Sequence, residues 1–320
     1  MTKIQDFTYP SSDGRHTIHA REWLPEGEAR GVVQIVHGVA EYIARYDHVA
    51  RFLNDHGYIV CGEDHLGHGD SAKEDEYGYF TKYDGWTLVT ADVRTLRQTQ
   101  GKKYPGLPYF LLGHSMGSFL TRTYLCRYPG ELTGAILSGT GQEPGLTVAA
   151  GKLLAQMICS AKGDRYVSVL LDKLSLGSYN NKFKPNRTEV DWLSRDNAAV
   201  EAYVKDPRCG FKATAGMFRD MMGGLQYISN PKNLAQMDKS TPIYLFSGAE
   251  DPVGGCGKGV KKVYGYFDAQ GVKDLHMKLY PGGRHEMFNE INREEVMEDL
   301  LTWLEAHVKQ APAPTSAAAK

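Results

Sequence analysis

The chain has 320 residues and a formal net charge of −1; 42% of its residues are hydrophobic and 23% are charged. This composition is that of a globular protein, and the interspersed basic and acidic residues exclude the clustered positive charge on which nucleic-acid binding depends. The longest apolar stretches have the length of a strand and are too short for a membrane-spanning helix.

The cysteines and the N-terminal residues indicate where the protein works. The five cysteines are widely spaced and contain no CxxC pair: Cys61, Cys126, Cys159, Cys209 and Cys256. This usage is typical of reduced thiols rather than of a disulfide framework. The first ten residues, MTKIQDFTYP, lack the apolar segment of a secretion signal. We therefore expect a cytoplasmic protein.

Eight short strand patterns run along the chain. Residues 7–9 and 17–25 alternate apolar and polar side chains, as strands with one covered face do. Six further runs, most of them almost continuously apolar, lie at 31–36, 58–62, 109–113, 134–138, 242–248 and 276–282. Such runs are typical of parallel strands buried on both faces, and helical periodicity separates several of them. The order predicts an α/β fold with a mostly parallel eight-stranded sheet, an antiparallel start and helices on both faces.

One long segment interrupts this alternation. Roughly a hundred residues between the sixth and seventh strand patterns contain no convincing buried strand but many helix-forming residues. A structureless loop of that length is implausible in a compact domain. We expect a helical cap at 142–238, inserted into an α/β core made of residues 1–141 and 239–310. The low-complexity residues 311–320 predict a disordered tail.

Residues 113–117, GHSMG, fit the nucleophile-elbow pattern G-x-S-x-G. This pattern places a serine on a sharp turn between a strand and a helix, with small residues two positions to either side. A strand pattern, YFLL, precedes it, and a helix pattern, MGSFLTRTYLCRY, begins inside it. The context favours Ser115 as a nucleophile over a turn serine in a glycine-rich loop.

A nucleophilic serine needs a base, which follows it in the chain order of this elbow. Three histidines follow Ser115. His276 falls inside a strand pattern and His307 inside a helix pattern, whereas His285 lies just after the last strand, in PGGRHEMFN. Because strand ends present the chemistry in such sheets, we expect His285 to be the base.

The acid that orients the histidine must also lie at a strand end. Asp251 does so in SGAEDPVGG, directly before Pro252, and Glu250 is the neighbouring alternative. The only candidate after the strand at 134–138 is Glu143. We prefer Asp251 because Pro252 fixes the loop after it.

An oxyanion requires two backbone N–H donors. We expect Met116, next to the nucleophile, to supply one, and Val39, in the loop after the strand at 31–36, to supply the other. His37 begins the same loop, and we expect its ring to anchor that loop rather than to take part in the chemistry.

Six sequence blocks together resemble the monoacylglycerol lipase and lysophospholipase branch of the α/β-hydrolases, which is also described as serine aminopeptidase-like. The blocks lie at 37–46, 63–71, 113–117, 191–207, 247–254 and 280–290. They follow the family's order, and the resemblance extends over residues 15–308. It implies the α/β-hydrolase fold with the same triad, the same oxyanion donors and a lid-like cap.

The loop at 37–46 departs from the family's pattern His-Gly-x-Gly-Glu-His. Ala40 stands at the second glycine and Tyr42 at the second histidine, while Glu41, Arg45 and Tyr46 match. We expect the loop still to turn, with Tyr42 beside the entrance to the acyl site, where it would narrow or redirect that site.

Other patterns receive plainer interpretations. Asp64, His65 and His68 follow a strand, but His-x-x-His spacing in a glycine loop is poor evidence for a metal site. We expect a hydrogen-bonded loop there, and neither a metal nor an organic cofactor. Cys256 has no base assigned to it, so we expect an unreactive thiol.

The predicted cap contains more apolar residues than a solvent-exposed connecting segment needs, among them Leu170, Leu174, Met217, Met221 and Met222. We expect some of them to receive an acyl chain above Ser115, since methionine adapts well to flexible ligands. The cap would also allow transient contact with a membrane surface.

These features predict a serine hydrolase that cleaves carboxylic esters, such as monoacylglycerol or lysophospholipid, through an acyl-serine intermediate. The expected partner is a small-molecule ester. An aminopeptidase or amidase, a thioesterase and a carbon–carbon bond hydrolase would use the same triad, and an inactive binding protein would retain the fold. Met116 disfavours the peptidase, because peptidase relatives commonly carry tryptophan after the serine.

Overall fold

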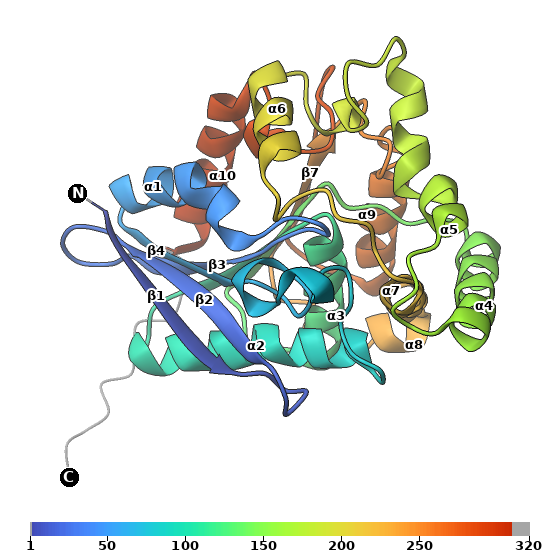
Figure 1. Ribbon diagram of the computed structural model, residues 1–320. Coiled ribbons are helices and arrows are strands. Elements are labelled where there is room, and N and C mark those ends of the chain that lie inside the picture. The colour runs from blue at the N-terminus through green and yellow to red at the C-terminus, as the bar shows by residue number, and fades with distance from the viewer. Residues whose placement is uncertain (1, 309–320) are drawn as a thin grey trace.

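The computed structural model describes residues 2–308, and an eight-stranded sheet runs through its centre (Figure 1). The strands are β1 (Lys3–Pro10), β2 (Thr17–Leu24), β3 (Gly31–Val36), β4 (Tyr58–Glu63), β5 (Tyr109–His114), β6 (Gly134–Ser138), β7 (Ile243–Gly248) and β8 (Leu275–Tyr280). Their order in the sheet is β1-β2-β4-β3-β5-β6-β7-β8. β2 pairs antiparallel with β1 and with β4, and all other pairs are parallel. The predicted mostly parallel sheet and its antiparallel start are confirmed.

Helices cover both faces of the sheet because successive side chains of a strand point to opposite sides. On β3, Val33 packs in one core with α1 (Asp47–Asp55) and α10 (Arg293–Val308). Val32 packs in the other core with α2 (Gly85–Lys103), α3 (Met116–Arg127) and α9 (Lys258–Gln270). Figure 1 shows α1 and α10 on one side of the strands and α2 on the other. Short 3-10 helices lie at Ile43–Tyr46, Gly69–Ser71, Glu74–Glu76 and Met287–Asn289.

The segment between β6 and β7, residues 139–242, is called the insertion below. Its helices are α4 (Gly145–Lys162), α5 (Val169–Leu174), α6 (Asn197–Lys205), α7 (Ala215–Tyr227) and α8 (Pro231–Leu234), with 3-10 helices at Leu176–Phe183 and Asp191–Leu193. Side chains cap several helix starts: Asp196 accepts from the N–H groups of Ala198 and Ala199, and Thr214 from that of Met217. The insertion is therefore helical, while the boundaries of a separate cap at 142–238 stay a prediction.

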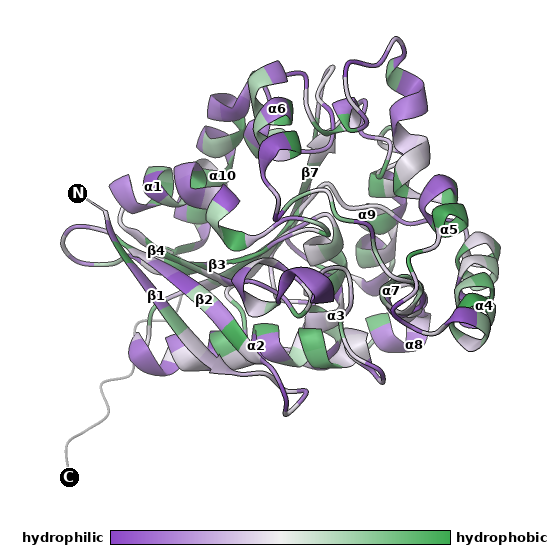
Figure 2. Cartoon of the chain, in the orientation of Figure 1, coloured by the Kyte–Doolittle hydropathy of each residue, from purple (hydrophilic) through white to green (hydrophobic). Residues whose placement is uncertain are grey.

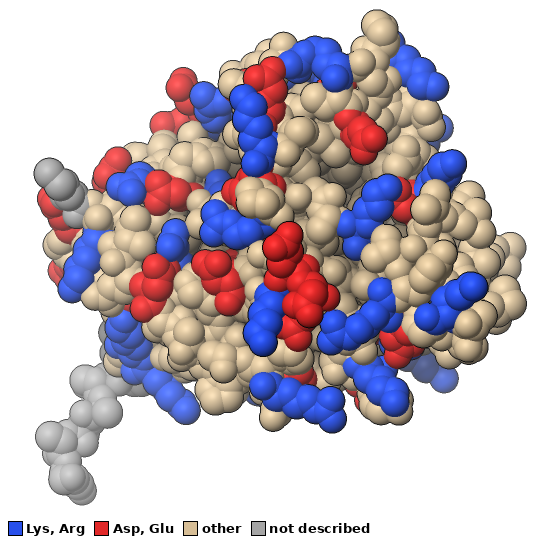
Figure 3. Space-filling model, viewed as in Figure 1, with Lys and Arg blue, Asp and Glu red and all other residues tan. Residues whose placement is uncertain are grey.

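The exposed face of α4 carries large apolar side chains. On α4, Leu146, Leu153 and Met157 are 87%, 61% and 55% exposed. The buried face of α4 carries smaller residues, Ala155 and Cys159, which pack in one cluster with residues of α7. Figure 2 shows hydrophobic residues on α4, and Figure 3 shows few charges over it, whereas both signs are interspersed over the rest of that view.

Within residues 2–308, no helix is both long enough and apolar enough to cross a bilayer. The predicted disordered tail at 311–320 lies outside the described residues.

Candidate active site

Ser115 stands on a sharp turn between β5 and α3. Its backbone has φ 53° and ψ −120°, and positive φ is uncommon for residues other than glycine. A Cβ at Gly113 would lie 2.3 Å from the Gly117 carbonyl oxygen, and one at Gly117 would lie 1.9 Å from that of Val36. Only glycine fits these two positions, so the motif permits the turn that holds Ser115 at the carboxyl end of β5.

The loops after β7 and β8 bring Asp251 and His285 together. His285 Nδ1 lies 3.0 Å from each carboxylate oxygen of Asp251, and both side chains are buried. Asp251 also accepts hydrogen bonds from Ser247 Oγ (2.7 Å) and from the Val253 N–H (2.9 Å). Because an ionised carboxylate only accepts hydrogen bonds, the proton of a neutral His285 lies on Nδ1, and Nε2 is left as an acceptor.

The structure separates Asp251 from the two alternative acids. Glu250 forms an ion pair with Lys182 of the insertion and is nearly half exposed. Glu143 is exposed near the start of α4. Of the three carboxylates, Asp251 is the one that is hydrogen-bonded to His285 in the described part of the chain.

Two buried histidines lie side by side with opposite pKa directions. Burial opposes charge on the His285 ring, but the charge of Asp251 and its hydrogen bond outweigh burial and raise the pKa of His285 above its usual value. The ring of His114 lies 4.7 Å away, and burial lowers the pKa of His114 to about 3. His285 therefore accepts a proton readily, whereas His114 stays neutral.

Backbone N–H groups lie close to Ser115. Gly38 packs against it: a Cβ at Gly38 would lie 3.1 Å from Ser115 Cβ. The N–H groups of Val39 and of Met116, the first residue of α3, have no hydrogen-bond partner within residues 2–308. Free N–H groups at a helix N-terminus and in a neighbouring loop can bind an oxygen anion.

The ring of His37 holds the loop that carries Val39. His37 Nδ1 lies 2.7 Å from the Gly38 carbonyl oxygen, and Nε2 accepts from the His65 N–H (3.0 Å). The rings of His37 and His65 are stacked, with centroids 4.0 Å apart. These contacts agree with the anchoring role expected from the sequence.

Two residues to which sequence reasoning gave no role link this loop to the histidine loop. Glu41 accepts from the Gly38 N–H and from Arg45, both at 2.5 Å. Arg45 also donates two 2.8 Å hydrogen bonds to Glu286, the residue after His285. Burial would raise the pKa of Glu286, but Arg45 outweighs it and lowers that pKa to about 2. The available signal was that Glu41 and Arg45 match the family-like block at 37–46.

Comparison with known proteins decides the family. Residues 27–292 match the family model described as Serine aminopeptidase, S33. The chain belongs to this family. The monoacylglycerol lipase of Mycolicibacterium smegmatis is 33% identical over 290 residues, which cover 89% of this chain and 92% of that protein. The monoglyceride lipase of Rattus norvegicus is 26% identical, with 95% and 91% covered.

The fold agrees with this assignment. A highly thermostable carboxyl esterase from Bacillus coagulans, solved in complex with glycerol, superposes with a TM-score of 0.89 and 29% identity, covering 96% of this chain and 100% of the esterase. This S33 family member is thus an α/β-hydrolase of the monoacylglycerol lipase branch, and it is a carboxylic ester hydrolase.

In this S33 hydrolase a cavity of about 470 Å³ opens beside Ser115 and His285, between the core and the insertion. Its apolar lining residues include Val39, Leu176, Val190, Trp192, Leu193 and Phe211. The Trp192 ring lies 5.0 Å from that of His285. Charged residues complete the wall, among them the exposed Lys173 and Glu189 and the ion pair of half-buried Asp172 with exposed Lys212 (2.9 Å).

The residues expected to receive an acyl chain do not line this cavity, and their assignment is corrected. Met217 and Met221 are buried in the core that α7 shares with α2 and α3, and Met222 packs beside α4. Leu170 and Leu174 are exposed on α5. Apolar periodicity shows that a helix has an apolar face, but it does not show which neighbour covers that face. The insertion side of the cavity wall comes instead from the end of α5, from Tyr203 of α6 and from the turns and loops up to α7.

Tyr42 also differs from expectation. Its side chain does not line the cavity but forms hydrogen bonds with Asp206 and Arg208 of the insertion. It therefore does not narrow the acyl site.

The polar loop after β4 is bonded as expected. Asp64 accepts from the N–H groups of Ile43 and Asp70, and it lies 3.0 Å from His19 Nδ1. The atoms that His19, Asp64 and Asp70 could offer to a metal lie within 4.8 Å of one another. Because Asp64 already serves three neighbours and Asp70 is exposed, these contacts are those of a loop support.

Proposed function

We propose that this chain hydrolyses carboxylic esters with medium or long acyl chains, such as monoacylglycerol or lysophospholipid, through an acyl-serine intermediate. The observation that carries the proposal is the hydrogen bond between His285 and buried Asp251, in loops beside the elbow serine Ser115. A serine hydroxyl becomes a good nucleophile when a positioned imidazole removes its proton.

The mechanism uses the triad residues and two backbone N–H groups. His285 Nε2 takes the proton of Ser115 as Oγ attacks the ester carbonyl, while Asp251 orients the ring and stabilises the imidazolium. The N–H groups of Val39 and Met116 bind the oxyanion of the tetrahedral intermediate. His285 then protonates the leaving alcohol, and the acyl group stays on Ser115. A water molecule then attacks the acyl-serine with His285 again as the base, and the carboxylic acid leaves Ser115.

The cavity supports an amphipathic substrate. Val190, Trp192 and Phe211 offer an apolar surface to an acyl chain, and exposed Lys173 and Glu189 offer polar groups to the alcohol part. The names of two relatives, a monoacylglycerol lipase and a monoglyceride lipase, agree with this class of ester. Burial of a methylene group stabilises binding by about 0.8 kcal/mol, so kcat/KM should rise about threefold to fourfold per added carbon until the cavity is filled.

The apolar outer face of α4 supports a transient contact with lipid surfaces. Leu146, Leu153 and Met157 are exposed together on one helix. Exposed apolar patches mark interaction surfaces more often than surfaces that face only solvent. Long-chain esters are found at such surfaces, so the contact would bring the enzyme to its substrate.

Replacement of Ser115 by alanine tests the mechanism. Ser115→Ala should lower kcat by about 10⁴-fold to 10⁶-fold, with the thermal unfolding midpoint almost unchanged, because only a hydroxyl is lost. Ser229→Ala, a hydroxyl deletion in the insertion, is the matched control and should keep full activity. Retention of more than a few per cent of activity by Ser115→Ala would rule out this nucleophile.

A rate panel tests the substrate class. It compares esters of graded acyl length with monoacylglycerols, lysophospholipids and aminoacyl amides, each supplied as monomers and in phosphatidylcholine vesicles. We expect rising rates with acyl length, low rates with amides and a further gain on vesicles. A flat acyl-length profile would contradict the acyl-chain proposal.

A further inference from the structure

The loop that carries Val39 is held by the insertion as well as by the core. Ala40 has a φ of 57°, a left-handed conformation that costs free energy for a residue with a Cβ. Its carbonyl oxygen accepts two hydrogen bonds from the insertion, one from Tyr203 Oη (2.9 Å) and one from the Gly210 N–H (3.0 Å). The insertion therefore supports the strained backbone directly after Val39.

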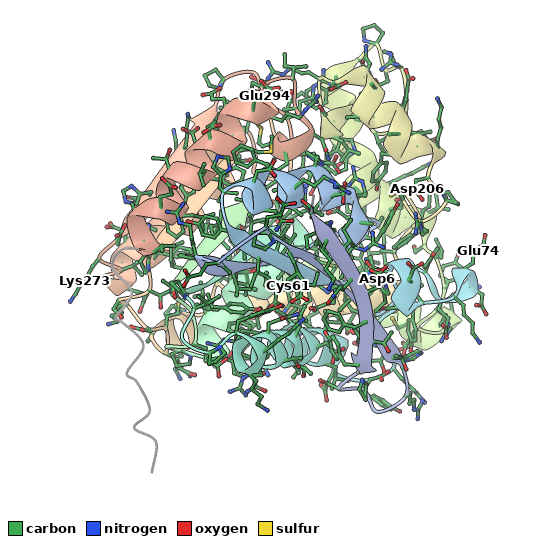
Figure 4. All side chains as sticks on the ribbon, turned by 90° about the vertical axis from the view of Figure 1, so that its left-hand side faces the viewer. Asp6, Cys61, Glu74, Asp206, Lys273 and Glu294 are labelled. Carbon is green, nitrogen blue, oxygen red and sulfur yellow. The ribbon has the colours of Figure 1, made fainter. Side chains whose placement is uncertain are left out.

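Tyr42 is held by the same part of the insertion. Its hydroxyl donates to Asp206 Oδ2 and accepts from Arg208 Nη2, both at 2.6 Å. The guanidinium carbon of Arg208 lies 3.9 Å from the centroid of the Tyr42 ring, and Arg208 Nε donates to Asp206 Oδ1 (3.4 Å). Tyr42, Asp206 and Arg208 are called the clamp below, and Figure 4 labels Asp206. Burial raises the pKa of Tyr42, so its hydroxyl keeps the proton that it donates.

The hydrogen bonds of this loop reach two different parts of the molecule, the core and the insertion. Glu41 accepts from the Gly38 N–H, and Arg45 links Glu41 to Glu286 in the histidine loop of the core. Ala40 and Tyr42, on either side of Glu41, are bonded to the insertion. Val39 lies between these supports, and its N–H has no partner within residues 2–308.

We propose that the clamp positions the Val39 N–H for the oxyanion, so that the insertion helps to set the rate of the chemical step. This proposal rests on the proposed serine mechanism. The clamp holds residues 206–210 of the insertion against the loop, so without it the Gly210 N–H no longer supports the left-handed backbone at Ala40, which relaxes and turns the Val39 N–H away from the forming oxyanion. Because the oxyanion is absent from the bound ester, the loss lowers kcat and leaves KM unchanged. The clamp residues are positioning residues and do not touch the substrate.

The variant Tyr42→Phe removes the clamp hydroxyl and keeps the ring. We expect kcat to fall about tenfold, as for the loss of one or two hydrogen bonds, and thus by less than the 10²-fold to 10³-fold that follows removal of an oxyanion donor. The inhibition constant of a trifluoromethyl ketone, which forms an oxyanion on the serine, should rise by the same factor. The ether analogue of the same ester forms no oxyanion, so its affinity for Tyr42→Phe should equal its affinity for the unmodified enzyme.

Further variants separate positioning from general damage. Asp206→Ala removes the clamp from the insertion side and should reproduce the loss in kcat, with the double variant no worse than either single variant. It also carries the test if Tyr42→Phe fails to fold. Tyr58→Phe removes a buried hydroxyl that has no hydrogen-bond partner within residues 2–308, and it should leave kcat unchanged.

The proposed role of the clamp is refuted if Tyr42→Phe keeps full kcat, or if the ketone and the ether lose affinity equally. Ser115→Ala distinguishes the two proposals. An inactive Ser115→Ala beside a fully active Tyr42→Phe refutes the clamp alone, whereas an active Ser115→Ala refutes the serine mechanism and the clamp with it.

Discussion

The strand-end loops of the core and the cavity wall of the insertion are built differently. Ser115, Asp251 and His285 follow strands of the sheet and are buried, and Asp251 is hydrogen-bonded to His285. The facing wall comes from residues between 172 and 212, where exposed charged side chains alternate with apolar ones. The sheet therefore fixes the positions on which the proposed chemistry depends, whereas the insertion supplies the facing wall of the cavity. The two regions meet at the clamp.

The largest expected effect breaks the core side of this comparison. Asp251→Asn should lower kcat about 10⁴-fold, because the amide presents a donor to His285 and favours the wrong tautomer. Steady-state kinetics with the best ester of the panel measures the loss. Glu250→Gln, at the neighbouring exposed carboxylate, is the control and should lose little. The reverse pattern would transfer the orienting role to Glu250.

A smaller effect is expected on the insertion side. Leu176→Ser places a hydroxyl on the cavity wall and should flatten the rise of kcat/KM with acyl length, with about a threefold to tenfold loss on long esters and almost none on acetyl esters. Leu174→Ser, two residues away and 66% exposed, is the matched control. Equal acyl-length profiles for Leu176→Ser and the unmodified enzyme would remove the acyl chain from this wall.

The strands and the candidate catalytic residues of the core could be predicted from the sequence because each of these features has a local cause. Buried parallel strands are continuously apolar, and the elbow needs glycine at 113 and 117, so both leave short patterns. The order of serine, acid and histidine along the chain left three histidines, and the positions just after strand patterns then favoured His285 and Asp251 or Glu250. The choice between the two acids needed the hydrogen bonds of the folded chain.

The residues of the cavity wall could not be predicted in this way. The apolar periodicity of α7 is real, but Met217 and Met221 use it to pack against the core. Tyr42 was placed at the entrance by its position in the loop, although its partners, Asp206 and Arg208, are more than 160 residues away. Contacts between segments so distant in sequence leave no local pattern.

The smallest expected effect is a shift along the pH axis. Because His285 must be neutral to act as a base, kcat/KM should rise with pH through the pKa of His285, which Asp251 holds above its usual value. In Asp251→Asn burial dominates, so the residual activity should begin at lower pH. The same raised pKa stabilises the fold below the unfolded pKa of about 6.5, and this contribution is lost as pH rises through the folded pKa. An identical acidic limb in both proteins would contradict the pairing.

Covalent labelling with a fluorophosphonate, located by peptide mass spectrometry, tests the central claim most directly. The reagent reacts with an activated serine and mimics its tetrahedral intermediate. We expect one adduct per chain, on the peptide that contains Ser115, much slower labelling of His285→Ala, and none of Ser115→Ala. An adduct on another residue, or undiminished labelling of Ser115→Ala, would contradict the assignment of Ser115 as the nucleophile.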